Sequence, residues 1–538
     1  MTSVLEPPTA TQIQNPVLTG FHPDPSILRV NQDYYLATST FEWFPGVRIH
    51  HSRDLVHWRT LQAPLRRSSQ LDMTGNPNSC GIWAPCLSHD GEKFHLIYTD
   101  VKTWNSGPFK DSHNYLVTAT DIQGEWSEPI YLNSSGFDPS LFHDTDGRKW
   151  LLNMRWDHRA GKNQFSGIML QEYDPKEQKL VGQVKNIFSG TPLGLVEGPH
   201  IYKYNGWYHL LTAEGGTSYE HAVSLARSRT LDGEYEIHPN NPVLTSWEKP
   251  LLELRKAGHA SLVETQNGEW YLAHLCGRPL EPTLERGFCP LGRETSLQAM
   301  EWREDDWLYL RGDGNSPYSL VAAPLLEPQV WESALSRDDF DQPDLRLDWQ
   351  SLRLPIDSSW LSLTERPDFL RLYGRESLIS NHNQSLIGRR LQHFNATAST
   401  KLEFEPQHFQ QMAGLAAFYD NQHWVYLRVS SDEQLGKTLS LLVLDAGVYS
   451  EPLEQEVPIQ GAVHLRLVFE RQKFYFAYSS DGSTWQRIGS DFETYKLSDD
   501  YCNGLSFTGL FIALCAQDLA GTKIQADFDY FEYQGNHD

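Results

Sequence analysis

The chain has 538 residues, with 45 basic and 69 acidic side chains and a formal net charge of −24. This length is too great for one hydrophobic core, so we expect at least two domains. The excess of acidic residues, with no basic stripe, argues against nucleic acid or an anionic membrane surface as the partner, because both bind clustered lysine and arginine.

The N-terminal segment, residues 1–14, is a polar tail with two prolines and lacks the pattern of a signal peptide. The sequence has no run of about eighteen apolar residues, so no membrane-spanning helix is expected. Its six cysteines show neither a paired framework nor metal-type spacing, which indicates reduced, buried thiols. These features together predict a cytoplasmic protein.

Residues 15–315 repeat one unit five times. In each unit a turn with a small residue precedes an aromatic-rich strand by about ten residues. The turns centre on Pro25, Pro85, Pro139, Pro199 and Ala260, at steps of 60, 54, 60 and 61 residues. A period near sixty with several short strands per unit predicts a five-bladed β-propeller, one blade per repeat.

Gly312 and Gly314 just before it, and Pro317, Pro324 and Pro328 within it, mark a linker at residues 316–336, and the repeat does not continue into residues 337–538. Helical periodicity is nearly absent, and the second region shows short alternating strands with an Asp481-Gly482 turn. Strands are predicted at residues 401–404, 413–419, 424–429, 440–444, 463–469, 474–478, 511–515 and 526–533. The pattern predicts an antiparallel β-sandwich, and the whole chain is expected to be all-β.

Three of the five repeats carry a carboxylate at or next to the same register position: Asp24, Asp138 and Glu197. Inner strands of a propeller run along its axis, so these three side chains should converge. Clustered carboxylates are unfavourable unless they have a task, and glycosidic hydrolysis needs both a carboxylic acid and a carboxylate. Taken singly, each residue could equally be a turn residue, because Asp-Pro commonly starts a turn. Their shared register favours the catalytic interpretation.

With these motifs the chain resembles glycoside hydrolase family 43, and within it the β-xylosidases that often also cleave α-L-arabinofuranosides. The matching segments are residues 15–26, 39–46, 81–85, 136–144, 197–200, 258–261, 288–294, 366–378 and 526–531. The resemblance covers nearly the whole chain and implies a concanavalin-like sandwich that closes the active-site pocket.

The resemblance also implies roles for the three carboxylates. Asp24 would be the general base, Glu197 the general acid, and Asp138 the residue that orients the acid and tunes its pKa. Family members invert the anomeric configuration, so a water molecule should fit between Asp24 and the sugar. The two catalytic carboxyl groups should then lie about 6.5–9.5 Å apart.

Further pocket residues follow from the same resemblance. Arg293 would approach the sugar hydroxyls and offset the clustered negative charge, although a surface salt bridge is the alternative. Aromatic walls are expected from Phe41, Trp83 and Trp156, which without the motifs would be assigned to the core.

Two contacts complete the expected pocket. Thr217 follows Glu214-Gly215-Gly216, where related enzymes contact the substrate. Phe507 resembles a ring that the sandwich inserts over the propeller mouth, and packing within the sandwich is its rival interpretation.

His259 occupies the axial position of the fifth repeat. Relatives often hold a central cation, commonly calcium, which this histidine reaches through water, but a single imidazole is a poor calcium site by itself. No cofactor is otherwise required. One departure from the family pattern is Cys86, which stands where an aspartate often follows Trp-Ala-Pro.

The expected function is exo-acting, inverting release of D-xylose from the non-reducing ends of β-1,4-xylooligosaccharides, with α-L-arabinofuranosidase side activity. Relatives commonly form dimers or tetramers, so a homo-oligomer is expected. Three alternatives remain: an arabinofuranosidase or arabinan-degrading enzyme on this fold, a retaining fructose-handling propeller, and a non-catalytic sugar-binding protein. The fructose enzymes carry an Arg-Asp-Pro motif that this chain lacks, and mere binding has no use for three clustered carboxylates.

Overall fold

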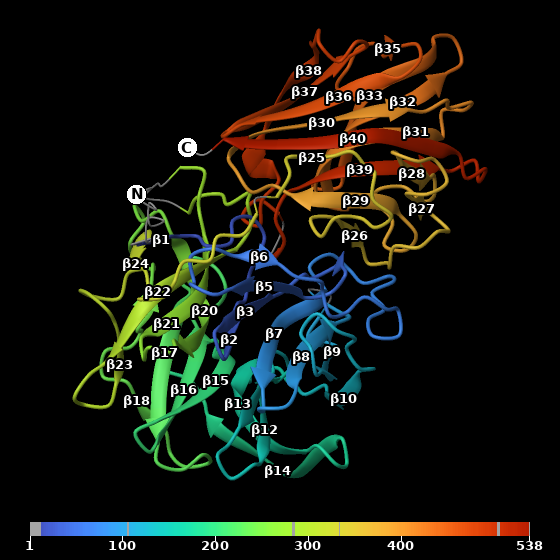
Figure 1. Ribbon diagram of the computed structural model, residues 1–538. Coiled ribbons are helices and arrows are strands. Elements are labelled where there is room, and N and C mark those ends of the chain that lie inside the picture. Colours follow the sequence, from blue (N-terminus) through green and yellow to red (C-terminus); the bar gives the residue numbers. More distant parts are fainter. Residues whose placement is uncertain (1–11, 105–106, 282–285, 333, 503–505, 537–538) are drawn as a thin grey trace, which may run out of the picture.

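The computed structural model describes residues 12–104, 107–281, 286–332, 334–502 and 506–536. Strands of these residues form two bodies, and Figure 1 shows the β-propeller below and the β-sandwich above it. Apart from one 3-10 turn, η1 (Thr494–Lys496), the described residues contain no helix. No described helix, therefore, has the length and hydropathy that crossing a membrane requires. The predicted all-β class, propeller followed by sandwich, is confirmed.

The propeller has five blades, each an antiparallel sheet of consecutive strands. The first two are β2 (Ser26–Val30), β3 (Asp33–Thr38), β5 (Arg48–Ser52), β6 (Arg59–Thr60), and β7 (Gly81–His89), β8 (Phe94–Val101), β9 (Ser112–Ala119), β10 (Ile130–Asn133). The third is β11 (Ser140–His143), β12 (Lys149–Trp156), β13 (Phe165–Asp174), β14 (Lys179–Phe188). The last two are β15 (Glu197–Tyr204), β16 (Trp207–Glu214), β17 (Ala222–Ser228), β18 (Glu236–Ile237), β19 (Leu244–Thr245), and β20 (Arg255–Glu264), β21 (Trp270–Gly277), β22 (Glu294–Trp302), β23 (Leu308–Leu310).

The backbone carries the same repeat as the sequence. A residue with positive φ stands at the head of the inner strand in every blade: Asp24 (56°), Ala84 (24°), Asp138 (55°), Gly198 (57°) and His259 (39°). Glycine adopts the left-handed region freely, and aspartate and histidine are among the residues enriched there, whereas alanine is strained. At or next to this turn each blade contributes one residue to the cavity at the axis, namely Asp24, Ala84, Asp138, Glu197 and His259, and for this reason the carboxylate register in the sequence is meaningful.

The ring closes through the start of the chain. Strand β1 (Gln12–Gln14), in the predicted tail, pairs with β24 (Leu320–Ala322), in the predicted linker. The Asn15 side chain then exchanges two hydrogen bonds with the backbone of Leu297 on β22, at 2.7 and 2.9 Å. Amide–backbone pairs of this kind replace a missing ladder partner. The segment before Asp24 is thereby fixed against the fifth blade.

The sandwich consists of two antiparallel sheets. One contains β25 (Arg337–Asp338), β27 (Leu361–Ser362), β28 (Leu370–Tyr373), β30 (Asn395–Glu403), β36 (Val463–Glu470), β37 (Lys473–Ser479), β38 (Gln486–Glu493) and β40 (Gln525–Asn536). The other contains β26 (Gln350–Leu352), β29 (Ser385–Arg390), β31 (Gln411–Asp420), β32 (His423–Asp432), β33 (Gly436–Asp445), β34 (Val448–Ser450), β35 (Val457–Pro458) and β39 (Phe511–Asp518). Facing Leu, Phe and Val side chains of the two sheets form one buried core.

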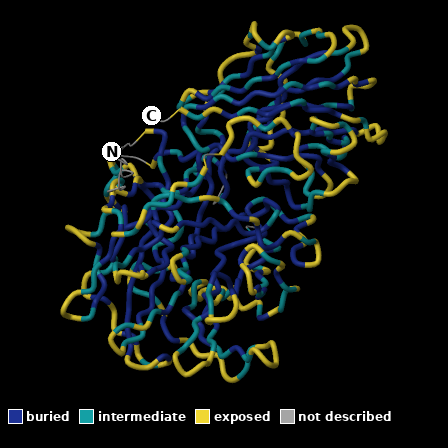
Figure 2. Tube along the Cα trace, in the orientation of Figure 1, coloured by how far each residue is buried: buried dark blue, intermediate teal, exposed yellow. Residues whose placement is uncertain are grey.

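The second sheet continues into the propeller. Strand β4 (Trp43–Phe44) lies between β3 and β5 in the sequence, yet it pairs with β26 of the sandwich. The Trp43 ring is fully buried and stacks on Phe511 of β39, with 3.6 Å between the ring centroids. Figure 2 shows that the region where the two bodies meet is largely buried, whereas exposure concentrates in the loops at the outer ends. The two domains therefore share both a sheet and an apolar core.

Seven of the eight predicted sandwich strands lie within β31–β33, β36, β37, β39 and β40, and the eighth, residues 401–404, overlaps the end of β30 and passes it by one residue. Most observed strands extend beyond the predicted ends. The sequence analysis did not find β29, which contains Gly388 and two consecutive arginines, or the mostly exposed β38. Alternating hydrophobicity is weak in both strands, because neither has one clean apolar face.

Candidate active site

A cavity of about 320 Å³ opens at the propeller axis under the sandwich. Every residue that the sequence analysis placed in the site lines it: Asp24, Phe41, Trp83, Asp138, Trp156, Glu197, Thr217, His259, Arg293 and Phe507. These residues come from all five blades and from the sandwich loop before β39. The structure thus brings side chains 483 positions apart in the sequence, Asp24 and Phe507, to one cavity.

Asp24 precedes β2 and is 5% exposed. Its Oδ2 accepts a hydrogen bond of 2.7 Å from the Ser39 hydroxyl, and its Oδ1 accepts one of 3.2 Å from Nη1 of Arg293. Burial raises the pKa of this carboxyl, but Arg293, His259 and the Ser39 hydroxyl together outweigh burial and hold the pKa below its ordinary value. Asp24 is therefore an ionised carboxylate at neutral pH.

Glu197 opens β15 in the fourth blade and is 8% exposed. Burial and the negative charge of Asp24 raise its pKa to about 8, against smaller opposing effects of Lys110 and Arg293. No hydrogen bond from a described donor reaches its carboxyl group, so the positive charges of Lys110 and Arg293 alone favour the ionised form, and burial with Asp24 outweighs them. Glu197 consequently holds its proton at neutral pH.

Asp138 precedes β11, and its protonation is coupled to that of Glu197. Burial, Glu197 and Asp24 raise its pKa, while the Gly198 N–H, which donates to its Oδ2 at 3.0 Å, opposes the rise. Because Asp138 receives this donor and Glu197 does not, a proton shared by the two acids belongs on Glu197. The bond also ties Asp138 to the residue that follows Glu197, which fixes the backbone of the acid.

Of the three carboxyl groups in this buried cavity, Asp24 is therefore ionised and Glu197 protonated, with Asp138 beside them. Environments that push two carboxyl pKa values apart assign the base and the acid of a hydrolytic pair. The arrangement can deprotonate a water molecule on one side of a bond and protonate the leaving oxygen on the other.

Arg293, just before β22, connects the two domains at the cavity. Its Nη1 donates to Thr217 Oγ1 at 2.8 Å as well as to Asp24, and its Nη2 donates to the backbone oxygen of Phe507 at 3.2 Å. The side chain is buried, so the surface salt bridge that was its alternative does not describe it. Arg293 holds the sandwich loop, the Thr217 loop and the Asp24 carboxylate in one geometry.

Aromatic rings build the wall next to the acid. Phe507 lies 5.4 Å from Phe41 and 5.2 Å from Trp83 between ring centroids, so it packs on the propeller rather than within the sandwich. Trp156 packs on Phe137, with 6.3 Å between centroids. Such rings suit the apolar CH faces of a sugar ring.

Lys110 and Trp104 line the same cavity, although the sequence analysis did not predict them as site residues. The Lys110 Nζ lies over four rings, at 3.8 Å from Trp156, 4.1 Å from Trp104, 4.7 Å from Phe137 and 5.3 Å from Trp83. Burial lowers its pKa to about 8, even though Glu197 and Asp138 favour its charged form. Both residues lie in the connection between β8 and β9, outside the five-fold register, so no repeat signal marks them.

His259 lies at the hub, with its Nδ1 3.8 Å from Asp138 Oδ2. A Cβ on Gly198 would come within 3.0 Å of the imidazole, so glycine is required where the fourth blade passes this ring. Burial lowers the pKa of His259, and a neutral ring results. Calcium prefers six to eight oxygen ligands, and no group of three close ligand-type side chains includes His259 among the described residues. Calcium at the hub stays a prediction, and no step of the reaction is assigned to it.

Cys86 lies on β7 two residues after Ala84 and is buried. It borders a different cavity, together with Ser26 and His200. All six cysteines are buried and unpaired.

Comparison with known proteins identifies both domains. Residues 13–308 match the family model "Glycosyl hydrolases family 43", and residues 337–534 match "Beta xylosidase C-terminal Concanavalin A-like domain". The beta-xylosidase of Bacillus subtilis (strain 168) is 51% identical over 533 residues, which cover 97% of this chain and 99% of the relative. Xylosidase/arabinosidase 43B of Humicola insolens is 50% identical over 97% of this chain and 98% of its own length. The crystal structure of xylan beta-1,4-xylosidase from Bacillus halodurans C-125 superposes with a TM-score of 0.95 at 57% identity, covering 97% of this chain and 100% of that chain.

Proposed function

Because this chain belongs to glycosyl hydrolases family 43, we propose that it is an exo-acting, inverting β-xylosidase that releases D-xylose from the non-reducing ends of short β-1,4-xylooligosaccharides. The observation that carries the mechanism is the opposite displacement of two carboxyl pKa values in one cavity: Asp24 below its ordinary value and Glu197 at about 8. Similarity to the relatives supports the choice of xylose.

In the proposed step the Asp24 carboxylate accepts a proton from a water molecule while the water oxygen attacks the anomeric carbon. The bond from that carbon to the glycosidic oxygen breaks, and Glu197 donates its proton to the leaving oxygen. Asp24 ends protonated and Glu197 ionised, and exchange of one proton with solvent restores both. Attack opposite the leaving group inverts the anomeric centre.

The shape of the cavity supports action at the chain end. Phe507 packs against Phe41 and Trp83, and its backbone oxygen is bound by Arg293, so the sandwich forms one wall of the pocket. An open groove for an internal segment of polymer would need this wall to be absent. The same feature disfavours an endo-acting arabinan-degrading enzyme.

A panel of aryl glycosides tests the substrate. We expect fastest turnover on the aryl β-D-xyloside, with a lower rate on the aryl α-L-arabinofuranoside, a second activity that the name of the Humicola insolens relative favours. Proton NMR during hydrolysis of the aryl β-D-xyloside, which releases a single xylose, should show α-xylose first. Initial release of β-xylose would overturn the inverting mechanism. If the chain bound the sugar but hydrolysed none of these substrates, the proposal that it is an enzyme would be wrong.

Two further expectations remain proposals: the homo-oligomer, a dimer or tetramer, and the cytoplasmic location. Light scattering of the purified chain tests the first, and fractionation of the source cells tests the second.

A further inference from the structure

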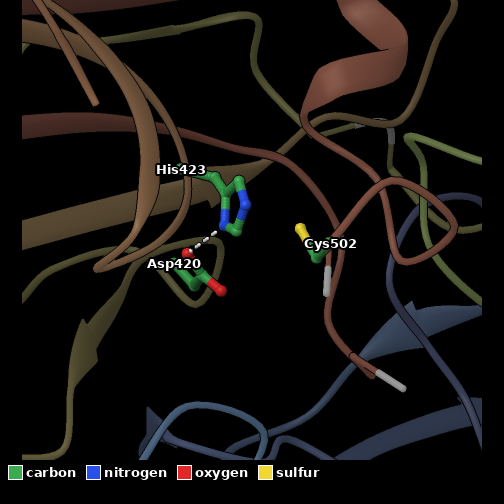
Figure 3. A group of neighbouring side chains, drawn as sticks. All are labelled: Asp420, His423 and Cys502. Atoms are coloured by element: carbon green, nitrogen blue, oxygen red, sulfur yellow. Dashed lines mark hydrogen bonds and ion pairs between the residues drawn. The ribbon is translucent and has the colours of Figure 1, made fainter. Parts of the chain in front are cut away.

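A second cluster of reactive side chains lies in the sandwich, outside the catalytic cavity. Asp420 ends β31, His423 begins β32, and Cys502 follows the η1 turn. One ligand-type atom from each residue lies within 4.8 Å of the other two. The three side chains point toward one another in Figure 3. Among the described residues this is the one such group of three.

The cluster is buried and incompletely satisfied. Exposure is 6% for Asp420, 5% for His423 and 4% for Cys502. Asp420 Oδ1 and His423 Nδ1 are 2.8 Å apart, but His423 Nε2 is buried without a hydrogen-bond partner. A buried polar atom left in this state is unfavourable, so an unpaired imidazole nitrogen inside a packed domain requires an explanation.

The surrounding charge points to a cation. Among the described residues, His423 is the one basic side chain within 4 Å of the Asp420 carboxylate. The neighbouring carboxylates Asp445 and Asp500 instead pair with the amines of Lys496 and Lys256. A buried carboxylate beside a buried thiol and an imidazole is unfavourable unless a positive charge balances it.

We propose that Asp420, His423 and Cys502 bind one divalent transition-metal ion of the zinc class. Zinc accepts carboxylate oxygen, imidazole nitrogen and thiolate sulfur at about 2.0–2.3 Å, and three ligand atoms within 4.8 Å of one another can close around such an ion with water in the fourth position. Calcium and magnesium prefer oxygen donors and do not fit this set. Binding displaces the thiol proton of Cys502 to solvent.

The site would connect the sandwich to the wall of the catalytic cavity. Cys502 is five residues before Phe507 in the sequence. The β31–β32 turn between the other two ligands carries Asn421, whose Oδ1 accepts a hydrogen bond of 2.6 Å from Asn78 of the propeller. The residue after Asn78, Ser79, accepts a 3.1 Å hydrogen bond from the Phe507 N–H. An ion at the cluster would therefore fix the β31–β32 turn, which through Asn421 binds the residue next to Ser79, the acceptor of the Phe507 N–H, without touching substrate.

The experiment uses the full chain, purified without an affinity tag and dialysed against a chelator, then titrated with Zn²⁺ and Co²⁺. We expect one equivalent of metal per chain by elemental analysis, a rise in Tm on adding Zn²⁺, and a thiolate-to-cobalt charge-transfer band with Co²⁺. Cys502→Ala should abolish that band and weaken binding by at least about tenfold. Cys515→Ala is the matched control, because this buried sandwich cysteine lies on β39 outside the cluster.

Absence of stoichiometric metal and of a Tm shift in the wild-type chain would overturn the proposal. So would a cobalt band or zinc affinity that Cys502→Ala leaves unchanged. Metal retained in Cys502→Ala but lost in His259→Ala would place the ion at the propeller hub and would likewise refute the sandwich site. Should Asp420→Asn or His423→Gln fail to fold, the cobalt band still decides: it should be absent in Cys502→Ala and present in Cys515→Ala.

Discussion

Replacing Glu197 by glutamine tests whether the raised pKa of this residue serves catalysis. Glutamine keeps the shape and neutrality of the protonated acid but cannot donate the proton. At pH 7 a carboxyl with a pKa of about 8 is about nine-tenths protonated, whereas one at its ordinary value of 4.5 would be protonated in about 0.3% of molecules. The environment therefore increases the population of the competent acid about 300-fold.

The assay compares two substrates that differ in their need for an acid. For xylobiose, whose leaving group is a poor one, we expect Glu197→Gln to lower kcat/KM by about 10²–10⁴-fold. For a dinitrophenyl β-xyloside, which leaves without protonation, the loss should stay below about tenfold. The alkaline limb of the wild-type profile, near pH 8, should disappear in the variant.

The same raised pKa predicts an effect on stability. Because the folded-state pKa of Glu197 lies above its unfolded value, its burial is tolerated at pH below 4.5 and costs free energy of folding increasingly as pH rises towards 8. A shift from 4.5 to about 8 corresponds to at most about 5 kcal/mol. Glu197→Gln should therefore unfold at higher urea concentration than the wild type at pH 9, and the two should converge at pH 4.5.

Glu214→Gln provides the matched control. Glu214 ends β16 in the same blade, is fully buried and accepts a hydrogen bond from the Thr191 N–H, but it does not line the cavity. This variant should keep the wild-type ratio between the two substrates. Equal losses on xylobiose and on the dinitrophenyl xyloside in Glu197→Gln would refute the assignment of the acid.

Asp24→Asn should lower turnover of both substrates by about 10²–10⁴-fold, because loss of the base does not depend on the leaving group; a loss confined to xylobiose would contradict its role. Lys110→Met removes a positive charge that lowers the pKa of Glu197, so the alkaline limb should move to higher pH, and an unmoved limb would show that Lys110 acts on the rings alone. Trp43→Ala should destabilise the chain by about 3–5 kcal/mol in urea unfolding, because Trp43 is fully buried and stacked on Phe511 across the domain interface. A loss below about 1 kcal/mol would mean that the shared core contributes little.

The repeat made the site predictable from the sequence. The steps between the turns place Asp24 and Asp138 at one register position and Glu197 next to it, and the structure gives the physical reason: a left-handed residue in every blade that turns the chain at the axis. Phe507 required the family resemblance, because no periodicity relates the sandwich to the propeller.

Other features of the structure correspond to no pattern in the amino-acid sequence. Lys110 is one of 45 basic residues, and its position over four rings depends on how the second and third blades meet. Strand β4 has two residues, and its partner β26 lies more than 300 positions later. Short-range patterning cannot specify such a pairing, because its energy comes from tertiary packing. The distance between the Asp24 and Glu197 carboxyl groups stays a prediction.

The pairing of β4 with β26 limits how this enzyme can be cut and recombined. A propeller expressed without residues 337–538 would present an unpaired strand edge and an uncovered Trp43 to solvent, which is a template for aggregation. Modules for engineering therefore belong at the ends of the polypeptide, and exchange between relatives should transfer β4 together with the sandwich that receives it.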